Sequence, residues 1–241
     1  MVTGAARGIG RAIVERLVAE GANVLMCDID EATLAQSARE LRQPHAKVDV
    51  SRVSEVGLMI ETAVARFGAL DILVNNAGIT HESDLLTLEE RDFDRVMAVN
   101  LKSMLFATQA AARQMVPRKR GAVVNISSVT ALLAHPLQIP YVISKAAVKQ
   151  LTNVTAIALA PHGIRVNAVG PGTIESDMSR DVLAGDAVQA TVRARTPLGR
   201  FGKPDEIAAT VAFLASEDAS YITGQTVYVE GGRLGLNYTM T

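Results

Sequence analysis

Three side chains in the second half of the chain have the types and spacing that proton transfer requires. Tyr141 and Lys145 are four positions apart, and Ser128 lies thirteen positions before the tyrosine. If residues 141 to 160 form a helix, the tyrosine and the lysine lie one turn apart on the same face. An ammonium group beside a phenol stabilises the phenolate and lowers a pKa that is ordinarily about 10. The spacing therefore predicts a tyrosine acid/base that works at neutral pH.

A glycine-rich turn opens the chain. The first residues read Met-Val-Thr-Gly-Ala-Ala-Arg-Gly-Ile-Gly, and an amphipathic helix with apolar residues at every fourth position follows them. Glycine lets the backbone turn tightly and approach a pyrophosphate, which then faces the helix N-terminus. The pattern predicts a dinucleotide site built on Gly4, Gly8 and Gly10.

The segment before this turn is short for a first strand. Only Met1, Val2 and Thr3 precede Gly4, whereas the first strand of a doubly wound sheet is central and strands usually have about five residues. We therefore expect the natural chain to begin several residues upstream. The intact mass of the native protein tests this expectation.

Two charged residues bear on the choice of dinucleotide. Asp28 follows the apolar run from Asn23 to Cys27, about twenty residues after the glycines. A carboxylate at this place accepts hydrogen bonds from an adenosine ribose and repels a 2′-phosphate. Arg7 opposes this preference, because a guanidinium can pair with such a phosphate. We predict NAD, with NADP as the less favoured alternative.

Helical and strand patterns alternate along the rest of the chain, with Gly and Pro at the joints. The alternation predicts an α/β fold: a doubly wound parallel sheet of the Rossmann type in three α/β/α layers. We expect one domain over 1–241, with a cofactor half of about 1–125 and a catalytic and substrate half of about 126–241. Expected strands are 23–27, 46–50, 70–75, 121–127, 164–169 and 226–229, and expected helices are 30–42, 51–67, 88–98, 100–116, 141–160 and 204–215.

Composition narrows the class of protein. The net charge is −1, and the only basic cluster is Arg118-Lys119-Arg120, so nucleic acid is not an expected partner. Cys27 is the single cysteine, which fits a reducing compartment. The sequence has no apolar run of about 20 residues and no secretory signal, so we expect a cytoplasmic protein without a membrane partner. No residues are assigned to a metal.

The motifs together resemble those of the short-chain dehydrogenase/reductase family, nearly from end to end. They are Thr3-Gly-Ala-Ala-Arg-Gly-Ile-Gly10, Asp49-Val50, Asn75-Asn76-Ala77-Gly78, Asn100, Ser128, Tyr141-x-x-x-Lys145, Arg165-Val-Asn167, Pro171-Gly172, Tyr221-Ile-Thr-Gly224 and Gly231-Gly232.

The resemblance implies a catalytic set. Tyr141 would exchange a proton with the substrate oxygen, and Ser128 would hydrogen-bond the same oxygen. Lys145 would lower the Tyr141 pKa and bind the nicotinamide ribose, while Asn100 would hold a water that links Lys145 to solvent. Ser127 is a rival for the hydroxyl, although spacing and strand alternation favour Ser128.

The resemblance also implies a cofactor set. Asp49 and Val50 would lie by the adenine, Asn75 beside the adenosine end, and Pro171 to Ser176 around the nicotinamide carboxamide. The full set is Gly4, Arg7, Gly8, Ile9, Gly10, Asp28, Asp49, Val50, Asn75, Tyr141, Lys145, Pro171, Gly172, Thr173, Ile174 and Ser176. Other interpretations stay open: Asn76 and Asn167 as structural asparagines, and Asp49 as an ordinary acid before a helix that Ser51 caps.

Substrate and assembly are less specified. Residues 129–139 and 175–197 should line the substrate pocket, the second as an amphipathic helix that covers the site. His135 and Gln138 are candidate contacts to a polar substrate. A sugar or polyol, a 3-oxoacyl thioester and a cyclic alcohol all remain open as the small-molecule substrate. Residues 146–160 contain one charge, Lys149, which predicts an outer face covered by another subunit; the resemblance implies a homotetramer.

The predicted function is an oxidoreductase that transfers a hydride between NAD(H) and an alcohol or carbonyl substrate. The alternative is a non-catalytic NAD-binding sensor or scaffold with the same fold, since a fold alone does not imply a function.

Overall fold

The strands of the sheet are all parallel and follow the order β3-β2-β1-β4-β5-β6-β7. The computed structural model describes residues 1–175 and 185–237. Within these ranges the strands are β1 (Val2–Thr3), β2 (Met26–Asp28), β3 (His45–Lys47), β4 (Ile72–Asn75), β5 (Gly121–Ile126), β6 (Ile164–Pro171) and β7 (Thr226–Val229). The order reverses direction between β1 and β4, as in doubly wound sheets that bind dinucleotides at this point.

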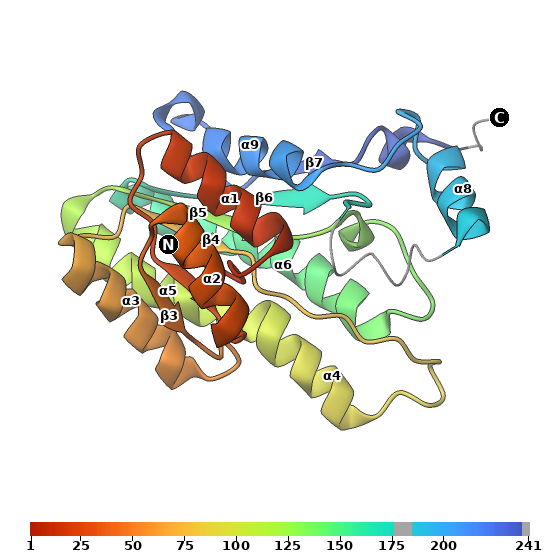
Figure 1. Ribbon diagram of the computed structural model, residues 1–241, viewed down its shortest axis with the longest axis horizontal. Helices are drawn as coiled ribbons and strands as arrows, with labels where there is room; N and C mark the ends of the chain where they lie inside the picture. Colours follow the sequence, from red (N-terminus) through yellow and green to blue (C-terminus); the bar gives the residue numbers. More distant parts are fainter. Residues whose placement is uncertain (176–184, 238–241) are drawn as a thin grey trace.

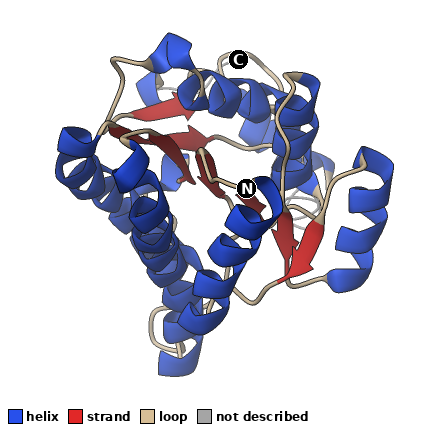
Figure 2. Cartoon of the chain, turned by 90° about the vertical axis from the view of Figure 1, so that its left-hand side faces the viewer, coloured by secondary structure: helices blue, strands red, loops and turns tan. Residues whose placement is uncertain are grey.

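Helices cover both faces of the sheet, which Figure 2 shows enclosed between them. They are α1 (Gly8–Ala19), α2 (Glu31–Leu41), α3 (Val53–Phe67), α4 (Glu90–Met97), α5 (Ser103–Met115), α6 (Ile139–Leu159), α8 (Asp186–Ala194) and α9 (Pro204–Ala215), placed in Figure 1. The doubly wound, three-layer prediction is confirmed.

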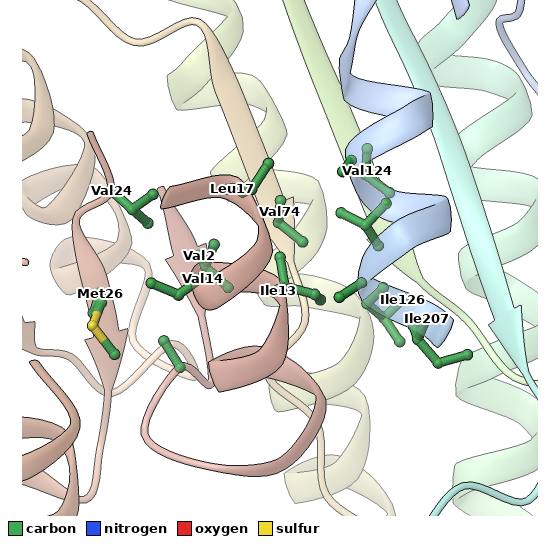
Figure 3. Packing of buried hydrophobic residues seen from close by; sticks show 14 of the residues in the cluster. Val2, Ile13, Val14, Leu17, Val24, Met26, Val74, Val124, Ile126 and Ile207 are labelled. Atoms are coloured by element: carbon green, nitrogen blue, oxygen red, sulfur yellow. The ribbon is translucent and has the colours of Figure 1, made fainter. Parts of the chain in front are cut away.

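The core forms two layers because successive strand residues point to opposite faces of the sheet. Val74 in β4 packs with the cluster under α1 and α9, whereas its neighbour Leu73 packs with the cluster under α3 and α5. Figure 3 shows the first cluster, in which Ile13 of α1 and Ile207 of α9 lie near Val124 and Ile126 of β5. The apolar periodicity of the helices thus fixes them over the strands whose ends carry the site.

Most predicted elements are found within a few residues of their expected bounds. The main difference lies between the expected helices 88–98 and 100–116, which are joined through a π-helical turn, Ala98–Lys102. The Ser103 N–H closes this turn by donating to the Ala98 carbonyl, five residues back. Such π turns occur frequently at functional sites.

The first strand is as short as the sequence indicates. β1 comprises Val2–Thr3, and the amino group of Met1 extends the pairing by donating to the Ile72 carbonyl at 2.8 Å. The carboxyl ends of β1, β4, β5 and β6 lie at one edge of the sheet because the strands are parallel. Thr3, Asn75, Ile126 and Pro171 end these strands and lead into the predicted site segments.

Candidate functional site

The predicted catalytic side chains come together beyond the end of β5. Ser128 follows this strand by two residues, and Tyr141 and Lys145 lie in the first two turns of α6, which Pro140 helps to start. The Ser128 hydroxyl hydrogen-bonds the Tyr141 side chain and also accepts from the Thr130 N–H at 3.1 Å. Sequence spacing alone could not show this contact, because the residues between them, 129–138, form a loop and a short 3-10 turn.

Lys145 faces the Tyr141 ring and is almost fully buried. Its Nζ donates to the Ile126 carbonyl at 2.8 Å and lies 5.5 Å from the centroid of the Tyr141 ring. Burial without a carboxylate partner disfavours the charged amine and lowers the pKa of Lys145 to about 8.

The Tyr141 pKa differs from the sequence expectation. Burial raises this pKa, and the hydrogen bond from Ser128 acts in the opposite direction. The expected lowering by Lys145 does not appear, because the ammonium lies over the ring and its hydrogen bond goes to Ile126. At neutral pH the geometry therefore keeps the phenol protonated.

The two adjacent serines have different partners. The Ser127 hydroxyl donates to the main-chain carbonyl of Lys145 at 3.0 Å and is buried. Ser127 therefore fastens β5 to α6, while Ser128 is the serine that contacts the Tyr141 side chain.

Asn100 lies in the π-helical turn and is completely buried. Its amide donates to the Ile79 carbonyl at 2.9 Å and to the Ser144 hydroxyl at 3.0 Å, and its oxygen accepts from the Ile79 N–H at 2.9 Å. These bonds tie the segment after β4 to α6. They bring Gly78 so close that a Cβ there would lie 3.5 Å from the Lys145 Nζ. The predicted water-holding role of Asn100 stays a prediction.

The glycine turn has the form that a pyrophosphate site needs. Gly4 and Gly8 have positive φ angles of 63° and 57°. A Cβ on Gly10 would lie 1.9 Å from the Gly4 carbonyl oxygen, so only glycine allows the helix this close to the strand. α1 starts at Gly8, and the Arg7 side chain does not cap it. The helix N-terminus thus points its N–H groups at the carboxyl edge of the sheet, where they suit an anion.

Asp28 stands at the end of β2, beside this turn. Its two carboxylate oxygens accept from the Ala6 N–H and the Asp30 N–H, each at 3.0 Å. Arg7 is exposed, and its guanidinium pairs with Asp30 at 3.3 Å. Asp28, which favours NAD, therefore contacts the same glycine turn that carries Arg7, the residue that favours NADP.

Asp49 and Val50, which were predicted to lie by the adenine, follow β3. The Val48 N–H donates to the Asp28 carbonyl at 2.9 Å, which places Asp49 and Val50 just past the end of β2. The Asp49 carboxylate accepts from the Ser51 N–H and hydroxyl, whereas Arg52 precedes α3 and offers no side-chain cap. The expectation that Ser51 caps this helix is thus wrong.

Asn75 ends β4, and its predicted place beside the adenosine end of the cofactor stays a prediction. Its amide is buried and donates to the Asn125 side chain at 2.9 Å and to the Thr108 hydroxyl at 3.3 Å. A cofactor contact by Asn75 would therefore come from its main chain only. Asn76 donates to the Thr3 and Gly4 carbonyls, and Asn167 donates to the Ile222 carbonyl, as expected of structural asparagines.

The segment after β6 is held by backbone bonds. The Gly172 N–H donates to the Val229 carbonyl at 2.9 Å, and the Gly202 N–H donates to the Thr173 carbonyl at 3.0 Å. Ile174 is buried beside Gly202. Ser176 and the first part of the predicted covering helix lie outside the described residues. The described part of that segment contains α8, which has no buried residue, so its covering role stays a prediction.

Almost the whole sequence also matches the profile of a known protein family. Residues 4–233 match the profile of a family described as enoyl-(acyl carrier protein) reductase, one of the short-chain dehydrogenase/reductase profiles. The chain belongs to the short-chain dehydrogenase/reductase family.

Relatives in the family have different names. The chain is 40% identical to a 3-oxoacyl-[acyl-carrier-protein] reductase of Thermotoga maritima and 43% identical to one of Staphylococcus aureus, each over 96% of both chains. A putative gluconate dehydrogenase from Agrobacterium tumefaciens superposes with a TM-score of 0.93 at 38% identity, over 98% of this chain and 95% of that one. A gluconate 5-dehydrogenase from Burkholderia cenocepacia, solved with NADP and tartrate, has a TM-score of 0.93 at 37% identity, over 97% and 94%.

Sequence reasoning missed one part of this dehydrogenase/reductase site. Asn125 in β5 is fully buried, accepts from Asn75 and donates to the Thr152 hydroxyl of α6 at 3.0 Å. This chain of bonds joins β4 and β5 to α6, the helix that carries Tyr141 and Lys145. The signal in the sequence was a lone asparagine within an apolar strand. Burying its amide would cost free energy unless the amide found a hydrogen-bond partner.

Residues 1–175 and 185–237 contain no group of three or more His, Cys, Asp or Glu that could hold a metal ion. In the same ranges, none of the helices combines the length and the apolar character that crossing a membrane requires.

Proposed function

We propose that this protein is an NAD(H)-dependent oxidoreductase that interconverts a ketone and a secondary alcohol, with Tyr141 as the acid/base. The observation that carries the proposal is the Ser128–Tyr141 hydrogen bond directly above the buried Lys145. A sensor or scaffold would gain nothing from a lysine buried against a tyrosine at an energetic cost, so this arrangement favours catalysis over the non-catalytic alternative.

The chemistry follows from which groups meet at the substrate oxygen. The bound nicotinamide supplies or accepts the hydride. Tyr141 gives its phenolic proton to the oxygen as negative charge develops there, and the Ser128 hydroxyl donates a second hydrogen bond to it. Because burial keeps the Tyr141 phenol protonated at neutral pH, we assign carbonyl reduction as the direction favoured at that pH.

The residues present fit a dinucleotide. The glycine turn and the N-terminus of α1 would hold the pyrophosphate, and Asp28 would accept the hydroxyl groups of the adenosine ribose. Lys145 would contact the nicotinamide ribose, and the backbone from Pro171 to Ile174 would contact the carboxamide. The carboxylate of Asp28 favours NAD, because a 2′-phosphate would meet its negative charge.

For the substrate we propose a 3-oxoacyl thioester. The loop after β4 and the loop before α6 join through the Ser83 N–H to the Leu137 carbonyl, at 2.9 Å, and through Gln138 to Glu82, at 2.7 Å. These loops flank the catalytic residues in the sequence and expose four apolar side chains, namely Leu85, Leu86, Leu132 and Leu137. An acyl chain suits such a rim better than a polyol does. The names of the two reductase relatives agree with this choice.

The decisive experiment compares Tyr141→Phe with the wild type. We expect the variant to bind NADH with unchanged affinity but to lose at least about a hundredfold in kcat with acetoacetyl-CoA, because proton transfer contributes roughly that much. Absorbance at 340 nm follows turnover, and NADH fluorescence follows binding. Activity within a few fold of the wild type would overturn the role of Tyr141. Turnover with gluconate but not with the thioester would overturn the substrate assignment.

We further propose that the protein assembles as a homotetramer through α5 and α6. These helices expose Leu105, Val154 and Ile157, and a groove between them is lined by Leu105 and Leu159 among others. Lys149 is the only charge within α6 after Lys145. Exposed apolar patches of this kind mark interaction surfaces in proteins. Light scattering at micromolar concentration tests the assembly, and a monomer mass would refute it.

A further inference from the structure

We propose that Asp30 is a specificity-determining residue for the dinucleotide. Its carboxylate pairs with the Arg7 guanidinium and caps the N-terminus of α2, and in both ways it disfavours the binding of a 2′-phosphate. This inference rests on the proposed NAD(H) function, and it explains how a basic residue in the glycine turn is compatible with NAD.

Asp30 is held close to the glycine turn by its neighbour Asp28. Asp28 ends β2, and its carboxylate accepts from the Ala6 N–H of the glycine turn and from the Asp30 N–H. These bonds fix the start of α2 against the turn that would carry the pyrophosphate. Asp30 is therefore held beside the ribose position that Asp28 defines.

The Asp30 carboxylate contacts both Thr33 and Arg7. It caps α2 by accepting from the Thr33 N–H at 3.2 Å and from the Thr33 hydroxyl at 2.8 Å. One of the same oxygens pairs with Arg7 at 3.3 Å. The Thr33 hydrogen bonds lower the Asp30 pKa, so the carboxylate is ionised at neutral pH.

These contacts weaken the two groups that could attract a 2′-phosphate. A 2′-phosphate gains from a guanidinium and from the N–H groups of a helix N-terminus. Asp30 engages both, and it adds a negative charge next to that of Asp28. Asp28 would therefore repel the phosphate directly, whereas Asp30 would weaken the two groups able to attract it.

The test is Asp30→Asn, which keeps a side-chain oxygen to cap α2 but removes the charge. The chain has no tryptophan, so the fluorescence of bound NADH and NADPH reports on the dinucleotide directly. We expect the Kd for NADPH to fall about fivefold, the upper range for an exposed ion pair, with the Kd for NADH unchanged within twofold.

Two further variants make the result specific. Glu31→Gln removes a charge one residue away that pairs with Lys47 at 3.2 Å, and it should leave the ratio of the two Kd values unchanged. Adding Arg7→Gln to Asp30→Asn should abolish most of the gain for NADPH.

Each other outcome contradicts a defined part of the reasoning. Equal ratios in Asp30→Asn and Glu31→Gln would overturn the proposal while leaving the proposed function intact. A gain that persists without Arg7 would overturn the role given to the Arg7 pair. Failure of the wild type to bind either dinucleotide would overturn the proposed function, and this inference with it.

Discussion

Replacing Lys145 with methionine should change how the stability of the protein depends on pH. Burial lowers the pKa of this lysine from 10.5 to about 8, which corresponds to a destabilisation of the folded state by about 3 kcal/mol when the amine is charged. Methionine has a similar shape without a charge. The difference in the free energy of unfolding between wild type and Lys145→Met should therefore vary with pH.

The sign follows from proton binding. Between about pH 8 and pH 10.5 the unfolded chain keeps the lysine proton that the folded protein has lost, so the lysine's penalty decreases as the pH rises. The penalty is complete below pH 8 and disappears above pH 10.5. Relative to the variant, the wild type should gain about 1 kcal/mol from pH 7 to pH 9 and about 2–3 kcal/mol by pH 10.

The assay is urea unfolding followed by far-UV circular dichroism at pH 7, 8, 9 and 10, without dinucleotide and at a fixed protein concentration. Cys27 also affects this range, since burial raises its pKa to about 12. Both proteins carry Cys27, so its contribution cancels in the difference.

A difference that stays constant from pH 7 to pH 10 would refute the reasoning. It would mean that the Lys145 amine is as well solvated in the folded protein as in the unfolded chain. The absolute difference at one pH is less informative, because the variant also leaves the Ile126 carbonyl without its donor.

Three further predictions test the two serines and two glycines. Ser128→Ala should lower kcat about a hundredfold, since it removes a hydrogen bond to the developing oxyanion, whereas Ser127→Ala should lower it less than about threefold; equal losses would contradict the separate roles of the serines. Gly10→Ala should destabilise the protein by about 3 kcal/mol or more and weaken NADH binding, because its Cβ would overlap the Gly4 carbonyl. Gly57→Ala, at a helical site with nothing within 4 Å, should stabilise by about 0.5–1 kcal/mol in the same urea experiment.

The sequence by itself determined the architecture and the catalytic candidates. Periodicity of apolar residues specifies which face of each helix is buried, and strands alternating with helices leave a parallel sheet as the compact solution. Tyr141 and Lys145 could be predicted because a helix places residues four apart on one face, and Ser128 could be predicted from the family resemblance and its spacing before the tyrosine. The glycine turn was accessible because only glycine tolerates its backbone, as Gly4 and Gly10 show.

The tertiary structure decided everything that depends on contacts between distant segments. Asn75 was predicted to lie beside the cofactor, and only the packed sheet shows that its buried side-chain amide donates to Asn125 of the neighbouring strand. The Tyr141 pKa was expected to fall, but burial is a property of the whole packed core and raises it. Arg7 and Asp30 are 23 residues apart, and only the approach of the glycine turn to α2 makes them an ion pair. The sequence gives the sign of each charge. The interaction between two charges depends on the distance between them, which only the fold sets.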